Sequence, residues 1–174
     1  MPRRSLALAL TLLALAAAPG AGRAEGAWDV AKKAVGKATT GKLQGEVNRR
    51  LLAEGRKNQC SFKTDTDDLA PGCDSKVRRL ANVLIDAKRR LNGGGIKNFK
   101  FVVSGHTDST GSASHNKELS GRRAAVIERE LVNRGVAQSD IESIGMGSER
   151  PLVKPDNTPA KRAKNRRYEI QVKL

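Results

Sequence analysis

Aromatic side chains are scarce in this sequence, which has one Trp, one Tyr and three Phe in 174 residues. Proteins that hold single-stranded nucleic acids stack the bases on aromatic side chains, so such a platform is missing. Acidic residues are also few, because 18 Asp and Glu stand against 33 Lys and Arg, for a net charge of +15. This excess favours an anionic partner, which could be a nucleic acid, an acidic membrane face or an anionic polymer outside the cell.

Long hydrophobic runs are missing as well. The longest is the 13-residue stretch from Leu6 to Ala18, which is too short to span a bilayer. Two arginines precede it and small residues follow, as in a signal peptide. We therefore predict a cleaved signal peptide at 1–24 and export to the periplasm. There the protein could be peripherally associated with the outer membrane or not attached to a membrane. The alternative is an uncleaved anchor. Export argues further against a nucleic-acid partner.

Cysteine occurs only twice, as Cys60 and Cys73. A cysteine near the predicted cleavage site would be the usual point of lipid attachment in bacteria, so we expect no lipid anchor. Two thiols cannot make a structural zinc site by themselves. In an exported protein the expectation is a disulfide, and closing this short loop would contribute about 3 kcal/mol. We therefore predict a Cys60–Cys73 disulfide.

The segment 25–58 differs from the rest of the chain. Its apolar residues recur at roughly helical spacing between basic ones, which predicts a basic amphipathic helical extension. Such a helix could pack on the following domain or adhere to an anionic membrane surface. We expect it to be dispensable for ligand binding, because the motifs described below all lie beyond it.

The segment 59–174 has the alternation of a compact α+β domain. We predict a two-layer α/β sandwich in which helices cover one face of a mixed sheet. The predicted order is β-α-β-α-β-β: a strand at 59–64, a helix at 75–91, a strand at 99–103, a helix at 116–134, a strand near 140–147, and a strand at 168–174.

Two charged residues stand out around the second of these helices. Asp108 follows the strand before it, and Arg123 lies in its first turns. A helix turns 100° per residue, which places Arg123 within the apolar stripe and Arg122 about 100° away from it. Arg123 should therefore face Asp108. Two explanations stay open: an internal salt bridge that fixes the loop, or a socket whose two charges hold a zwitterionic ligand.

An enzyme is the weaker interpretation of the same residues. His106, Asp108 and His115 could suggest a metal site, but their spacing is loose and interrupted by glycine and serine. The sequence has no evident order of nucleophile, histidine and aspartate. We therefore expect no catalytic residues, no metal and no cofactor.

Four motifs in order carry a family resemblance: "GHTDSTG", "NKELSGRRA", "GMGSERP" and "NRRYEI". From about residue 61 to 174 the chain resembles the OmpA-like C-terminal domain family. That family includes the periplasmic part of outer-membrane porin-like proteins and the peptidoglycan-associated lipoproteins. The resemblance implies noncovalent binding of peptidoglycan through its diaminopimelate-containing stem peptide, and a role in tethering or organising the cell envelope.

The resemblance also implies site residues. Asp108 and Arg123 match the family's contacts to diaminopimelate, and further pocket positions match Thr107, Asn116 and Leu119. Asn165 and Arg166 match the "NRR" motif, in which ligand and structural roles are harder to separate. Asp65 falls near another pocket position, although "SFKTDTDDLAP" departs from the family's first strand, and the cysteine pair is an addition.

The partners implied are peptidoglycan and, beyond it, outer-membrane or envelope proteins. The alternative function is that of a basic envelope protein that binds anionic lipid or glycan surfaces by charge alone. Such binding would weaken steeply with salt and ignore the identity of the stem peptide.

Overall fold

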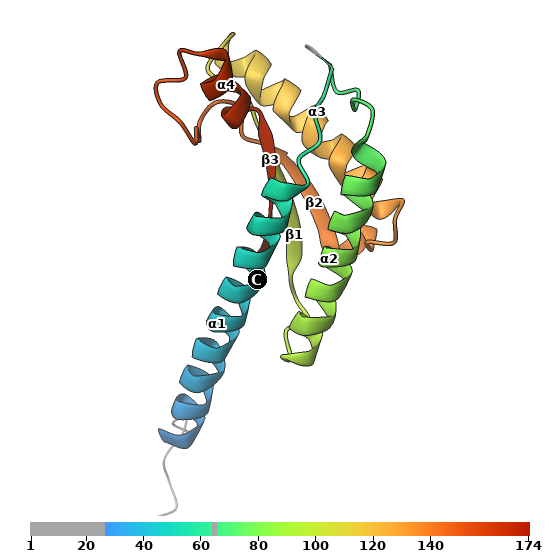
Figure 1. Cartoon of the computed structure of the whole chain (residues 1–174). Helices are drawn as coiled ribbons and strands as arrows, with labels where there is room; N and C mark the ends of the chain where they lie inside the picture. Colours follow the sequence, from blue (N-terminus) through green and yellow to red (C-terminus); the bar gives the residue numbers. More distant parts are fainter. Residues whose placement is uncertain (1–26, 64–65) are drawn as a thin grey trace, which may run out of the picture. The chain divides into compact units, whose positions relative to one another are not determined.

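The computed structural model describes residues 27–63 and 66–174 (Figure 1). The predicted signal peptide and Asp65 lie outside these ranges. Among the helices described, none is long and apolar enough to cross a membrane.

A three-stranded mixed sheet forms the centre of the domain. It consists of β1 (Lys100–His106), β2 (Ile141–Gly145) and β3 (Arg167–Lys173) in the order β2-β1-β3. The central strand β1 is parallel to β2 and antiparallel to β3. Strand β3 alternates buried and more exposed residues along its length, as its sequence pattern predicts. The α+β class with a mixed sheet is therefore confirmed.

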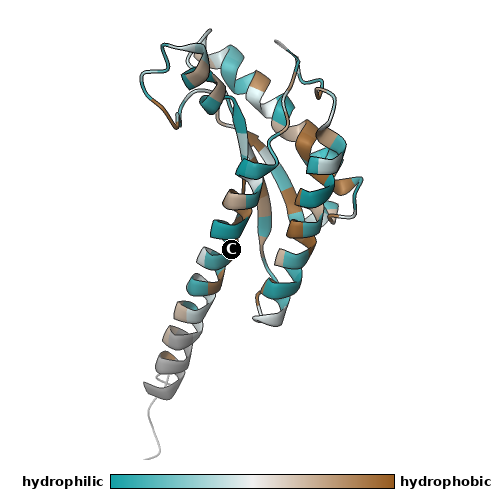
Figure 2. Ribbon diagram, viewed as in Figure 1, coloured by the Kyte–Doolittle hydropathy of each residue, from teal (hydrophilic) through white to brown (hydrophobic). Residues whose placement is uncertain are grey.

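Two long helices supply most of the rest of the core. They are α2 (Cys73–Gly93) and α3 (Ala113–Val132), close to the helices predicted from periodicity. Figure 2 shows hydrophobic residues on the strands and on the side of α2 that faces them. Large side chains that are almost fully buried join the layers: Leu80, Leu84, Phe101, Ile127, Leu131, Tyr168 and Ile170.

The predicted extension forms one helix, α1 (Ala27–Lys57). Val47 and Leu51 on this helix belong to the hydrophobic core, and Leu43 packs against it. The compact unit that contains the sheet begins at Gly36. The packing agrees with the interpretation that the helix packs on the domain. The boundary at residue 59 stays a prediction, and these contacts favour an earlier start.

The edge of β3 is covered by side-chain amides. Asn48 Oδ1 accepts from the Val172 N–H at 2.6 Å, and Asn48 Nδ2 donates to the Val172 carbonyl at 3.2 Å. Gln59 makes the same pair of bonds with Tyr168, at 3.2 and 2.8 Å. Two amides thus satisfy backbone groups that a neighbouring strand would otherwise satisfy.

The structure differs from the sequence prediction in two details. The stretch at 59–64 forms an isolated bridge, Phe62 with Leu69, in place of an extended first strand. The basic stretch between the last two predicted strands, for which no helix was predicted, contains the short helix α4 (Pro159–Asn165). The Thr158 side chain caps this helix by accepting from the Lys161 N–H.

Candidate functional site

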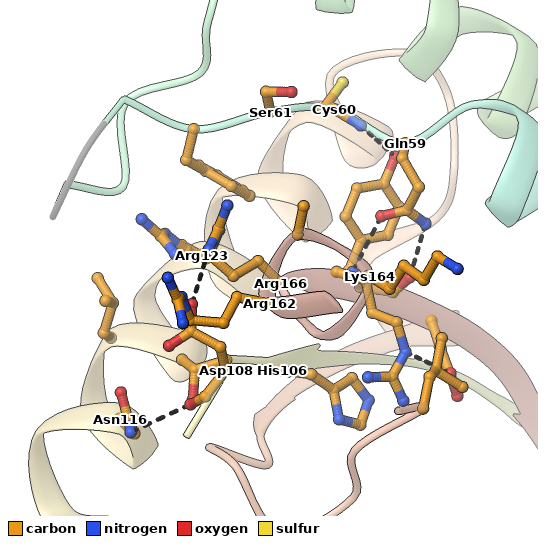
Figure 3. Close-up of a pocket in the computed structure, with 18 of the residues that line it drawn as sticks. Gln59, Cys60, Ser61, His106, Asp108, Asn116, Arg123, Arg162, Lys164 and Arg166 are labelled. Atoms are coloured by element: carbon orange, nitrogen blue, oxygen red, sulfur yellow. Dashed lines mark hydrogen bonds and ion pairs between the residues drawn. The ribbon is translucent and has the colours of Figure 1, made fainter. Parts of the chain in front are cut away.

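A cavity of about 1030 Å³ opens where β1 ends, α3 begins and β3 begins (Figure 3). It gathers the predicted site residues that the structure describes, from three separate parts of the chain. Their contacts to a ligand stay a prediction. The six residues are Thr107, Asp108, Asn116, Leu119, Arg123 and Arg166.

Glycine allows the end of β1 to approach α3 closely. A Cβ atom added to Gly105 would lie 2.2 Å from the Ser120 carbonyl oxygen, so no other residue fits there without a shift of the backbone. Just beyond, the Thr107 N–H donates to the Gly147 carbonyl at 2.9 Å. These contacts place the Thr107–Asp108 turn beside the start of α3.

Asp108 is buried and forms an ion pair with Arg166, whose Nη1 donates to Oδ2 at 2.7 Å. Its Oδ1 accepts from the Thr110 N–H at 3.0 Å. Burial by itself would raise the pKa of Asp108, but the hydrogen bonds from Arg166 and Thr110 outweigh it and leave the pKa below its ordinary value. The cavity therefore holds a carboxylate that is ionised at neutral pH.

Asn116 fixes the loop that carries Asp108. It is buried, and its Nδ2 donates to the carbonyls of Thr110 at 2.9 Å and Asp108 at 3.4 Å. Ser112 caps α3 by accepting from the His115 N–H at 3.2 Å. The start of α3 and the loop before it are thus one hydrogen-bonded unit.

The predicted difference between the two adjacent arginines of α3 is confirmed, because Arg123 lines the cavity and Arg122 does not. Arg123 Nε donates to the Thr66 carbonyl at 2.9 Å, and its guanidinium lies 5.0 Å from the centre of the Phe62 ring. Arg122 instead pairs with Glu118 at 2.6 Å along the exposed side of the helix. The anticipated charge partner of Asp108 was Arg123, whereas the structure pairs Asp108 with Arg166.

The two residues of the "NRR" motif now have separate places. Asn165 is fully buried, and its Oδ1 accepts from the N–H groups of Leu152 and Val153 at 2.8 and 3.1 Å. It therefore shapes the loop before α4. Arg166 is exposed at the cavity and reaches Asp108. A ligand contact of Arg166 stays a prediction.

No motif or periodicity in the sequence singled out Asp156. This buried carboxylate accepts from the Ser109 N–H and Oγ at 2.9 and 2.5 Å, and from Asn165 Nδ2 at 3.0 Å. The hydrogen bonds from Ser109 and Asn165 lower its pKa to about 2. Asp156 thereby ties the Asp108 loop to the segment before β3. Its one signal in the sequence is that it is an acid in a very basic stretch.

His106 and Thr107 bring polar atoms to the cavity wall. Both side chains are about 4% exposed, and both ring nitrogens of His106 and the Thr107 hydroxyl have no hydrogen-bond partner within the described residues. Burial, followed by the nearby charge of Arg167, lowers the pKa of His106 to about 4. The imidazole is therefore neutral at pH 7. In the described part of the chain, no three potential ligands gather in a way that could hold a metal ion.

Comparison with known proteins gives matches in sequence and in fold. Residues 61–166 match the OmpA family. The Mycobacterium tuberculosis "Peptidoglycan-binding protein ArfA" is 45% identical over 73 residues, or 42% of this chain and 22% of that protein. The Pseudomonas putida "Peptidoglycan-associated lipoprotein" is 33% identical over 110 residues, or 63% of this chain and 60% of that protein. The chain thus spans less than two thirds of either relative.

Solved structures agree in fold. The peptidoglycan-associated lipoprotein from Burkholderia pseudomallei matches with a TM-score of 0.54 at 22% identity, covering 66% of this chain and 89% of that one. The C-terminal domain of Helicobacter pylori MotB matches with a TM-score of 0.55 at 24% identity, covering 67% and 84%. At this level of identity the likeness concerns the fold alone.

Proposed function

The chain belongs to the OmpA family, and from that premise we propose that it binds peptidoglycan noncovalently in the bacterial cell envelope, through the diaminopimelate residue of the stem peptide. The observation that carries this proposal is the cavity in which Asp108, Arg123 and Arg166 meet. The proposed role is that of a binding module and not an enzyme.

The charges of the cavity suit this ligand. The side-chain end of diaminopimelate carries an ammonium and a carboxylate on one carbon. The Asp108 carboxylate would receive the ammonium, and the guanidinium of Arg123 would receive the carboxylate through paired N–H groups. Arg166, which forms an ion pair with Asp108, would add positive charge beside the carboxylate of the ligand.

The remaining wall would complete the recognition. Thr107 lines the cavity beside Asp108 and would contact the ligand there. Its hydroxyl, like the ring nitrogens of His106, is covered by protein and has no partner in the described residues, so a bond from the ligand to these atoms would need a movement of the side chain. Asn116 would hold the Asp108 loop in place, and Leu119 would contact the methylene chain of the ligand. Asp65 lies outside the described residues, and its role stays a prediction.

Lysine-type peptidoglycan provides the test. A lysine side chain has the ammonium but lacks the second carboxylate, so Arg123 would have no partner. We expect the mature chain, residues 25–174, to sediment with diaminopimelate-type sacculi and much less with lysine-type sacculi. Equal sedimentation with both, falling steeply as salt rises, would instead favour binding by surface charge, for which the net charge of +15 is the supporting observation.

A further inference from the structure

The cavity is larger than a single side chain requires. Its volume of about 1030 Å³ lies at the upper end of the range of about 300–1,000 Å³ found for pockets that take drug-sized ligands. It follows the chain from Arg166, which precedes β3, to Ile170 on β3, and this corresponds to about 13 Å at the rise of an extended strand. There is room for a peptide of several residues.

The far part of the cavity has a wall from α1, the segment that the sequence led us to expect to be dispensable for ligand binding. Leu52, Gly55 and Arg56 line it, together with Gln59. All of these residues precede residue 61, where the match to the OmpA family begins. In Figure 3, Lys164 of α4 is drawn on the Gln59 side of the cavity, and Asp108 and Asn116 are drawn on the opposite side.

Seven cationic side chains line the cavity, and five of them have protein partners. Within residues 27–63 and 66–174, the side chains of the other two, Arg56 and Lys164, make no ion pair and no hydrogen bond. Three of the five form ion pairs, which are Lys63 with Asp68, Arg166 with Asp108 and Arg167 with Glu169. The other two donate to backbone carbonyls, Arg123 to that of Thr66 and Arg162 to that of Asp156.

We propose that Arg56 and Lys164 form a second anion subsite of this cavity, which receives another carboxylate of the same peptide. This inference rests on the proposed function. In the stem peptide, the residue before diaminopimelate is a γ-linked D-glutamate, whose α-carboxylate is free. With the diaminopimelate end held at Asp108 and Arg123, that carboxylate is the next negative charge on the N-terminal side of diaminopimelate, and the terminal carboxylate of the peptide lies on its other side. The subsite therefore selects stem peptides with a free glutamate carboxylate over those in which it is amidated.

Two synthetic tetrapeptides that differ only at this group test the subsite. One contains D-glutamate and the other D-isoglutamine, both followed by diaminopimelate. Because Arg56 and Lys164 are exposed, we expect the mature wild-type chain to bind the carboxylate form about three- to tenfold more tightly in calorimetric titration. The variant with Arg56→Gln and Lys164→Gln should bind both peptides equally.

A matched control removes the same charge from the same two helices. Arg49 and Lys161 lie on α1 and α4 but do not line the cavity, so the variant with Arg49→Gln and Lys161→Gln should keep the wild-type preference. Loss of the preference in both double variants would show a general charge effect and overturn the subsite.

The remaining outcomes separate the two proposals. A wild-type chain that binds both peptides with equal affinity refutes the subsite and leaves diaminopimelate recognition standing. If the chain binds neither peptide, nor free meso-diaminopimelate, the proposed function fails and the subsite fails with it.

Discussion

Replacing Arg123 with Ala should remove most of the affinity for a diaminopimelate peptide, whereas Arg122→Ala should change it little. A charge-assisted hydrogen bond is worth about 1.5–3 kcal/mol, so losing the Arg123 contact corresponds to a loss of about 10- to 150-fold. Arg122 does not line the cavity, and its exposed pair with Glu118 is of a type worth about 0.3–0.5 kcal/mol of stability. Both changes remove one positive charge.

The structure also predicts an effect of Arg123→Ala on stability. The guanidinium holds the segment before α2 through the carbonyls of Thr66 and Lys63 and through the face of Phe62. Losing these contacts should lower the free energy of unfolding by about 1–3 kcal/mol. Arg123→Lys serves as a second variant, because it keeps the charge and removes the paired donors that a carboxylate engages.

The assay is titration of each folded variant with a stem-peptide fragment, after urea unfolding has shown that the variant is native under the conditions used. We expect the order of affinity to be wild type and Arg122→Ala together, then Arg123→Lys, then Arg123→Ala. If Arg122→Ala and Arg123→Ala bind the peptide equally well, the socket is refuted and binding by the basic surface takes its place.

Three further predictions concern stability and redox state. His106 has a folded-state pKa of about 4 against an ordinary 6.5, so the unfolded chain takes up its proton first, and the free energy of unfolding should fall as the pH drops from about 6.5 to about 4. In a series of urea unfolding curves over this pH range, His106→Asn should reduce the dependence of the free energy of unfolding on pH. An unchanged dependence on pH would contradict the burial argument. Cys60 and Cys73 are buried free thiols in the structure, and burial raises the pKa of the Cys60 thiol to about 12. We still expect a disulfide in the exported protein, and intact-mass analysis with and without reduction tests this. Two alkylatable thiols in the native protein would disprove the disulfide. Leu51→Ala should lower the free energy of unfolding by about 2–5 kcal/mol, because Leu51 is buried in the core, and an unchanged melting temperature would show that α1 does not belong to the folded domain.

Local periodicity was enough to place several elements of the fold and one residue of the site, Arg123. The apolar stripe of α3 put Arg123 toward the cavity and Arg122 away from it, because both assignments depend only on rotation about one helix. The alternation of apolar and polar residues in β3 likewise predicted which of its side chains are buried, because it depends on the geometry of one strand alone. Asp108 was singled out by its place after the preceding strand, whereas the pocket roles of Thr107 and Asn116 came from the family resemblance.

Contacts between distant parts of the chain were beyond such reasoning. Asp108 pairs with a residue 58 positions away, and the amide of Asn48 reaches a backbone group 124 positions away. No local pattern encodes either distance. The stretch predicted as a strand at 59–64 forms only the Phe62–Leu69 bridge, and Gln59 at its start bonds to Tyr168 of β3 through its side chain and not through its backbone.

The amides on the β3 edge have a consequence for association between molecules. An uncovered strand edge offers a row of N–H and C=O groups on which a strand from another chain can add, and this is a common route to aggregation. Here Asn48 and Gln59 occupy that row at Val172 and Tyr168, which lie four residues apart on the strand. A side-chain amide bonds to the edge as a strand would, but it offers no further edge of its own. The sheet therefore ends at β3. Copies of this chain at high concentration have one fewer strand edge through which they could polymerise.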